Sequence, residues 1–169
     1  MTEIPKEIEQ LLTPYKEELL KRYESKTGSN WFTLRACSYY EVFNRPRIVF
    51  PDISGKSKFS LDTSKNIALD GTFVIATGNK ALLGVLNSRL AWDYFINNCS
   101  SIGNAKNKGR LRLKKNHVNK FPIPKALLEG DDMTTELSAL VERIISEGET
   151  PKLDEELNRL VDEIYLAHK

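Results

Sequence analysis

The sequence predicts an α+β protein, in which a mixed core of sheet and helix is flanked by helices from both ends of the chain. Two β-branched and aromatic runs, RPRIVFPDI at 45–53 and GTFVIAT at 71–77, have the composition and the bordering turn residues of short strands. The segments at the two ends instead repeat apolar residues every three or four positions, as amphipathic helices do. With 169 residues, the chain is long enough to bury one sizeable core.

The first predicted segment, residues 1–30, is helical. Tyr15, Leu19 and Tyr23 recur every four residues, which predicts one helix with an apolar face. The turn-rich stretch SKTGSN at 25–30 ends this helix and links it to the core.

The predicted core, residues 31–125, begins with the strand that Pro46 and Pro51 border. Proline cannot donate a hydrogen bond to a neighbouring strand, so this strand is expected to be short or to lie at a sheet edge. After the second strand, residues 79–98 read as one helix whose N-terminus Asn79 can cap.

A polar stretch of small residues at 99–109 follows this helix and is predicted to be a loop. RLRLK at 110–114 then alternates basic and apolar side chains, with Leu111 and Leu113 on one face. Strict alternation is typical of a strand that is buried on one side only.

Residues 126–169 form the third predicted segment, an acidic helical hairpin. Two apolar stripes with helical spacing are separated by Gly148, which suits a helix end. Residues 129–169 hold twelve acids and four lysines or arginines, whereas residues 1–128 hold eleven acids and twenty-one lysines or arginines. This asymmetry suits a body that faces nucleic acid with an acidic appendage, and it suits two separately solvated surfaces equally well.

Basic residues concentrate in one stretch, because residues 94–128 contain eight lysines or arginines and no acid. Such a face suits the regular negative charge of a nucleic-acid backbone, and the interspersed asparagines can read adenine edges. The predicted DNA-binding residues are Arg45, Arg47, Lys56, Lys58, Asn104, Lys106, Asn107, Lys108, Arg110, Arg112, Lys114, Lys115 and Asn116. Among these, Arg110, Arg112 and Lys114 are assigned to phosphates, and the loops at 54–58 and 97–109 to bases.

Signals of catalysis are weak. The sequence has two histidines, no metal-ligand spacing and neither common glycine-rich phosphate loop. The two cysteines lack a second ligand nearby and are expected to be reduced, and no apolar run reaches the roughly 18 residues of a membrane span. We therefore expect a cytoplasmic protein without catalytic, cofactor or metal residues of its own, and without a membrane partner.

The sequence also resembles a known family. A series of motifs follows the order found in the TaqI-like C-terminal specificity domain. The series is Trp31, RPRIVFPDIS, the pair Phe59 and Asp62, GTF, LLGVLNSRLAWDYF, Gly109-Arg110 and FPIP. The TaqI-like domain is the target recognition domain of bacterial type IIG restriction-modification enzymes and related adenine-N6 DNA methyltransferases. The resemblance covers residues 30–125 well and the terminal hairpin loosely, and it implies that Ile48, Leu83 and Leu86 are packing positions.

In that family the domain follows a methyltransferase domain with an Asn-Pro-Pro-Tyr motif and an S-adenosylmethionine site. Neither the motif nor a recognisable cofactor site occurs here. The resemblance therefore implies a specificity part that recognises duplex DNA for a methyltransferase domain, present in cis or as a partner subunit, which would bind S-adenosylmethionine. By itself the chain should neither methylate nor cleave DNA.

Two other functions remain open from the sequence. Basic loops and aromatic residues also suit a module that binds RNA or single strands by stacking. Alternatively, the helical hairpin docks on a partner protein and the basic face is incidental.

Overall fold

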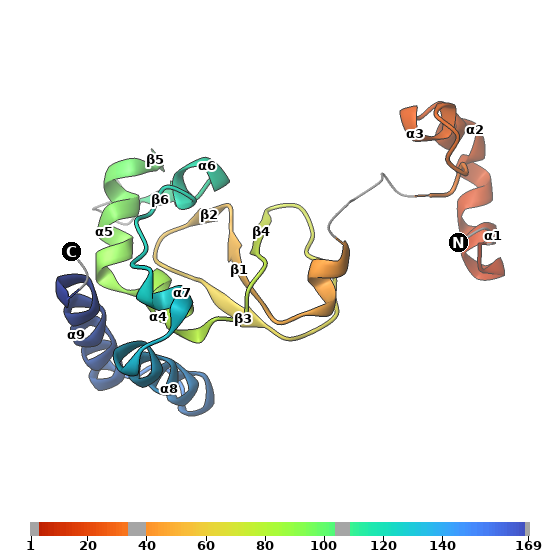
Figure 1. The fold of residues 1–169 in the computed structure, drawn as a ribbon. Coiled ribbons are helices and arrows are strands. Elements are labelled where there is room, and N and C mark those ends of the chain that lie inside the picture. Colours follow the sequence, from red (N-terminus) through yellow and green to blue (C-terminus); the bar gives the residue numbers. More distant parts are fainter. Residues whose placement is uncertain (1–3, 34–39, 104–108, 168–169) are drawn as a thin grey trace. The chain divides into compact units, whose positions relative to one another are not determined.

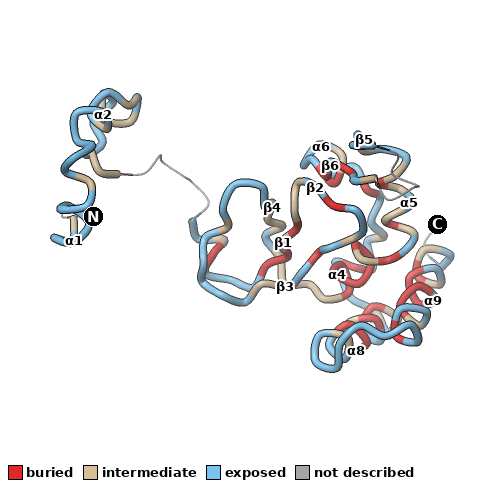
Figure 2. Tube along the Cα trace, turned by 180° about the vertical axis from the view of Figure 1, so that it is seen from behind, coloured by how far each residue is buried: buried red, intermediate tan, exposed pale blue. Residues whose placement is uncertain are grey.

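The structure is a computed structural model that describes residues 4–33, 40–103 and 109–167, and it confirms the α+β class (Figure 1). The chain divides into two compact units, Met1–Tyr40 and Glu41–Lys169. Both small sheets and the longer helices belong to the second unit, which therefore holds the core (Figure 2).

The first unit is helical as predicted, but the helix predicted to carry Tyr15, Leu19 and Tyr23 on one face is broken into short pieces. These are α1 (Lys6–Leu12), a 3-10 turn (Thr13–Tyr15), α2 (Lys16–Leu20) and α3 (Tyr23–Lys26). The break falls at Arg22, whose backbone is extended and whose guanidinium donates to the carbonyl oxygens of Trp31 and Thr33 at 2.9 and 2.7 Å. Tyr15 and Tyr23 are exposed, so the predicted apolar face is not buried within this unit.

The first sheet has the order β3-β1-β4 and is antiparallel throughout. Its strands are β1 (Arg47–Pro51), β3 (Ser60–Asp62) and β4 (Thr72–Ile75). The two predicted strands are thus confirmed as β1 and β4, and β1 is short. It lies at the centre of the sheet rather than at an edge, and Pro51 is tolerated because it is the last residue of the strand.

The second sheet has the order β2-β6-β5, also antiparallel. Its strands are β2 (Ile53–Ser54), β5 (Ser100–Ile102) and β6 (Arg110–Arg112). The alternation at 110–114 correctly predicted β6, with Leu111 and Leu113 fully buried. The prediction of a loop over 99–109 was wrong at its start, because Ser100–Ile102 pairs with β6.

The predicted helix over 79–98 is two helices, α4 (Lys80–Asn87) and α5 (Arg89–Asn98). Asn79 caps α4 as predicted, since its side chain accepts a hydrogen bond from the Leu82 N–H at 2.9 Å. The break is at Ser88, whose extended backbone ends α4 and begins α5. The Ser88 hydroxyl donates to the Val85 carbonyl oxygen at 2.7 Å and accepts from the Ala91 N–H at 3.2 Å, so one side chain satisfies both helix ends.

The predicted terminal hairpin consists of α8 (Asp132–Glu147) and α9 (Pro151–Ala167), preceded by the short helices α6 (Lys115–Val118) and α7 (Ala126–Glu129). Gly148 ends α8 with a positive φ of 93°, as its position predicted. The hairpin packs on α4 so closely that a Cβ atom at Gly84 would lie 2.8 Å from Val141. It therefore shares the core of the second unit, and the structure does not divide the chain at residue 125.

Arg47 is a structural residue, because its side chain is fully buried at the start of β1. The guanidinium forms an ion pair with the Asp62 carboxylate at 2.6 Å. It also donates to the backbone carbonyl oxygens of Phe43 (2.9 Å), Arg45 (3.3 Å), Ser64 (2.8 Å) and Asn66 (2.6 Å). These bonds hold the segment before β1 and the loop after β3 against one another. The assignment of Arg47 to DNA was therefore wrong, since no donor of this guanidinium faces solvent.

Replacing Arg47 should strongly destabilise the second unit. The substitution Arg47→Met leaves the Asp62 carboxylate and buried carbonyl oxygens without their donor, and breaking a buried pair in this way costs about 3–5 kcal/mol. Urea unfolding followed by circular dichroism measures the loss. Arg45→Met is the matched control, because Arg45 is exposed and its replacement should change the free energy of unfolding by less than about 0.5 kcal/mol.

Acid should weaken the same region. Hydrogen bonds from Ser64 and the neighbouring Arg47 guanidinium lower the pKa of the Asp62 carboxyl below its usual value. A lowered folded-state pKa adds stability above about pH 4 that is lost as the pH falls. Asp62→Asn should therefore show a smaller loss of unfolding free energy between about pH 6 and pH 3 than the wild type. Equal losses in the two proteins would rule out this linkage.

Candidate nucleic-acid interface

The outer surface of the second sheet carries arginines because of the alternation in β6. Leu111 and Leu113 enter the core, so Arg110 and Arg112 point outward. The register places Ile53 and Ser100 on either side of Arg112, and Ile102 beside Arg110. Directly opposed residues of antiparallel strands point to the same face, so small and apolar neighbours support the stems of both arginines.

The basic surface continues from β6 into the next turn. Lys114 follows the strand, and Lys115 and Asn116 open α6, all of them exposed. The position of the turn is fixed by buried Val118 and by hydrogen bonds from the His117 and Val118 N–H groups to the Lys114 carbonyl oxygen at 2.9 and 3.1 Å. We call Arg110, Arg112, Lys114, Lys115 and Asn116 the basic face.

The cations of the basic face have no internal partner. None of its lysines or arginines forms an ion pair or side-chain hydrogen bond with another residue that the structure describes. Several cations elsewhere in the second unit do pair, as in Lys80–Glu142, Arg89–Asp162, Arg143–Glu147 and Arg159–Glu163, whereas scattered exposed lysines such as Lys58 and Lys152 have no partner among the described residues. Four neighbouring positive charges without acids repel one another, and an external polyanion would relieve that repulsion.

A shallow hollow of about 480 Å³ lies at one side of the basic face, between β5, β6 and α6. Its polar lining consists of Ser100, Ser101, Arg112, Lys114, Asn116 and His117. All six side chains can donate hydrogen bonds, and none is an acid.

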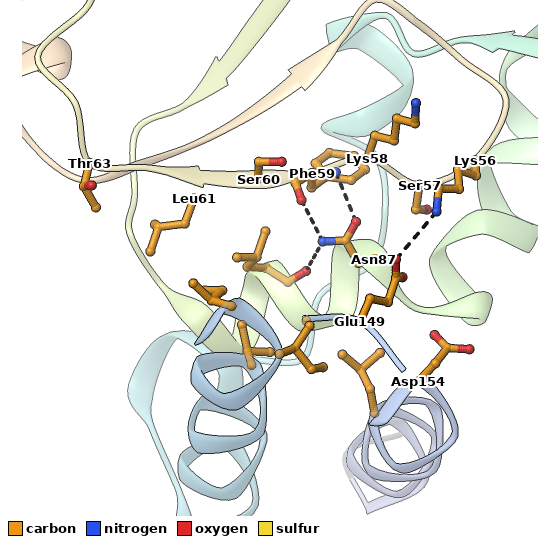
Figure 3. A pocket seen from close by; sticks show the side chains of 16 residues that line it. Lys56, Ser57, Lys58, Phe59, Ser60, Leu61, Thr63, Asn87, Glu149 and Asp154 are labelled. Atoms are coloured by element: carbon orange, nitrogen blue, oxygen red, sulfur yellow. Dashed lines mark hydrogen bonds and ion pairs between the residues drawn. The ribbon is translucent and has the colours of Figure 1, made fainter. Parts of the chain in front are cut away.

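The second predicted group of cations, Lys56 and Lys58, lies in the loop between β2 and β3. The loop starts beside β6, since a Cβ atom at Gly55 would lie 3.9 Å from the Arg110 side chain. Both lysines border a hollow of about 560 Å³, whose far wall is the terminal hairpin (Figure 3). Lys56 turns toward that wall and pairs with Glu149 at 3.6 Å. An exposed pair of this kind is weak, so it leaves Lys56 able to exchange partners.

Asn87 fixes the start of β3 at the edge of this hollow. Its side chain accepts from the Phe59 N–H at 3.0 Å and donates to the Phe59 carbonyl oxygen at 2.9 Å (Figure 3). It also donates to the Leu83 carbonyl oxygen at 3.2 Å. Asn87 therefore satisfies backbone groups where α4 meets β3, and its side chain is used by the fold rather than by a ligand.

The described residues offer no metal site and no membrane span. Within them, no group of three or more His, Cys, Asp or Glu side chains is placed to hold a metal ion. No helix in the part of the chain that the structure describes has the length and apolar character to cross a lipid bilayer.

The comparison with protein families decides what this scaffold is. The family model of the TaqI-like C-terminal specificity domain matches residues 6–123. The chain belongs to this family. The matched segment contains both sheets, α4, α5 and the basic face. Specificity domains of this family have a DNA-recognition role in restriction-modification enzymes. The matched segment begins at residue 6 and so includes α1–α3, which the sequence analysis placed before the domain.

The predicted DNA-binding residues of this specificity domain fall into distinct groups. The basic face brings together Arg110, Arg112, Lys114, Lys115 and Asn116, whose contact with DNA stays a prediction. Arg45 is exposed and lies just before the first residue of β1. β2 and β6 lie beyond the last residue of β1, so Arg45 is separate from the basic face (Figure 1). Asn104, Lys106, Asn107 and Lys108 lie outside the described residues.

Sequence reasoning missed part of the specificity domain's polar surface. His117 was not selected, and Ser100 and Ser101 were placed in a base-reading loop rather than in a strand, yet all three line the hollow beside Arg112. Three residues are too few to show a strand period, so the pairing of β5 left no pattern that could have revealed them.

The arginines of the basic face should be dispensable for folding of the specificity domain. They are exposed and unpaired among the described residues, so Arg110→Gln and Arg112→Gln remove repulsion and no native contact. Each should change the free energy of unfolding by less than about 0.5 kcal/mol in urea titrations. A loss comparable to that expected for Arg47→Met would identify these arginines as structural.

Proposed function

We propose that this chain is the non-catalytic target recognition domain of a type IIG restriction-modification enzyme or related adenine-N6 DNA methyltransferase, and that it binds duplex DNA sequence-specifically. The observation that carries the proposal is the basic face, whose four cations have no partner among the residues that the structure describes. The family membership supports the same assignment, because the matched segment holds the basic face together with buried core positions such as Ile48, Leu83 and Leu86.

In this proposal the basic face binds phosphates and the neighbouring loops select bases. Arg110 and Arg112 stand on a rigid strand, so they can fix the orientation of a duplex without reading its sequence. The loop at 54–58 starts beside this strand, and in this proposal it reaches into a groove of the duplex. Lys56 would exchange Glu149 for DNA on binding.

The methyl transfer itself belongs to a methyltransferase domain, either elsewhere in a longer chain or on a partner subunit. That domain would bind S-adenosylmethionine, and we assign no residue of this chain to the cofactor. The role of this chain is to hold the duplex in register while the partner extracts its target adenine from the base stack.

Binding should prefer duplex DNA and should depend on salt. We expect the logarithm of the affinity for a random duplex to fall with the logarithm of the salt concentration, with a slope of about −4 to −6. The triple variant Arg110→Gln, Arg112→Gln, Lys114→Gln should reduce the magnitude of this slope by about 2 to 3, because each phosphate contact contributes about 0.9. Fluorescence anisotropy with labelled duplexes measures both quantities.

The same titration separates this proposal from its alternatives. Tighter binding of single-stranded DNA or double-stranded RNA than of duplex DNA would indicate an RNA- or single-strand-binding module. Unchanged affinity and slope in the triple variant would show that the basic face does not contact the duplex. Arg45→Gln serves as the comparison for a cation remote from the basic face, and a smaller change in slope is expected for it.

A further inference from the structure

We infer that the hollow between β5, β6 and α6 is a binding site for one phosphate group of a nucleic-acid backbone. This inference rests on the function proposed above and names one contact within it. A site of this kind differs from a diffuse positive surface because neutral donors, and not charge alone, would position the phosphate oxygens.

Donors from three segments converge on the hollow. The register pairs Ser100 with Arg112, so a hydroxyl and a guanidinium stand side by side on the same sheet face. Asn116 and His117 reach the hollow from α6, and Lys114 lies between strand and helix. A phosphodiester has two unesterified oxygens that accept several hydrogen bonds, which this set of donors can supply.

These donors are not used by the fold. Within the described residues, the side chains of Ser100, Arg112, Lys114, Asn116 and His117 make no hydrogen bond or ion pair with other residues. Amides and hydroxyls elsewhere in the same unit serve the fold instead, as Asn79, Asn87, Ser88 and Asn158 do. A concentration of unused donors in one hollow indicates a ligand that is supplied from outside.

The hollow is rigid because its walls are anchored in the core. Leu111 and Leu113 hold β6 from behind, and Val118 holds α6. Phe121, which follows the turn, packs against the rings of Phe95 and Tyr94 at 5.6 and 5.1 Å between centroids. The anchored backbone reduces the conformational freedom lost on binding an anion, which is then mainly that of the exposed donor side chains.

The charge of the hollow favours an anion over a neutral group. Arg112 and Lys114 line it and no acid does, whereas Glu149 and Asp154 line the hollow beside Phe59. The position next to Arg110 makes the hollow continuous with the basic face, so a duplex bound there would place its backbone along β6.

The double substitution Asn116→Ala, His117→Ala tests this site in the complete chain. The change removes two hydrogen-bonding side chains and leaves every lysine and arginine of the basic face in place. The affinity for a random 12-base-pair duplex should fall about 3- to 10-fold while the salt slope stays the same. Asn119→Ala is the matched control, since this exposed amide ends the same turn outside the hollow and should leave the affinity unchanged.

A second measurement does not depend on any variant. In nuclear magnetic resonance spectra of the wild type, the amide signals of Asn116 and His117 should shift on addition of the duplex and of dimethyl phosphate. The signals of Glu155 and Asp162 on α9 provide the reference and should stay in place. The same spectra of the double variant verify that it remains folded.

The outcomes separate this site from the proposed function. Duplex binding with unmoved Asn116 and His117 signals and an unaffected double variant would overturn the phosphate site and leave the proposed function standing. Absence of duplex binding together with shifts caused by dimethyl phosphate would retain the site and overturn the proposed function. If neither probe moves these signals and no duplex binds, both are wrong.

Discussion

The position of the basic face depends on a single backbone crossing at Asp52. β1 leaves the first sheet at Pro51 and the chain enters the second sheet at Ile53, so one residue separates the two. The Asp52 N–H donates to the Gly71 carbonyl oxygen at 2.8 Å, and its own carbonyl oxygen accepts from the Leu113 N–H at 2.7 Å. The first bond continues the β1–β4 pairing and the second continues the pairing of β2 with β6. The orientation of the arginines on β6 is therefore set by the strand that contains the family's RPRIVFPDIS signature.

Two short arginine motifs show how far sequence alone can lead. In RLR and the leucine that follows it, Leu111 and Leu113 are buried in the core. The alternation therefore predicts correctly that Arg110 and Arg112 face outward. In RPR, the same spacing places Arg47 inside, because Asp62 stands opposite it in the sheet and backbone carbonyls surround its guanidinium. Strand register depends on two segments that are distant in the sequence. No local pattern therefore distinguishes the buried Arg47 from the exposed arginines of β6.

The helices and strands were predicted most reliably where a local signal was strong. Asn79, the run around Leu83 and the alternation around Leu111 each predicted an element that the structure contains. The break at Ser88 was missed because apolar spacing runs through it, and its cause is a hydrogen bond from the Arg89 N–H to distant Asn158 together with local capping. β5 and the hollow beside it also depend on contacts between distant segments, because β5 is defined by its pairing with β6. They could be recognised only in the structure.

The separation of charge in the second unit gives it an electric dipole. Positive charge collects on β6 and α6, and most of the acids lie on α8 and α9, which occupy a different side of this unit (Figures 1 and 2). A polyanion would exert a torque on such a body before any contact forms, turning β6 toward it and the hairpin away. At 0.1 M salt the torque acts within roughly 10 Å, which is enough to orient the last step of an encounter. The acidic hairpin would then contribute to productive association without touching the nucleic acid.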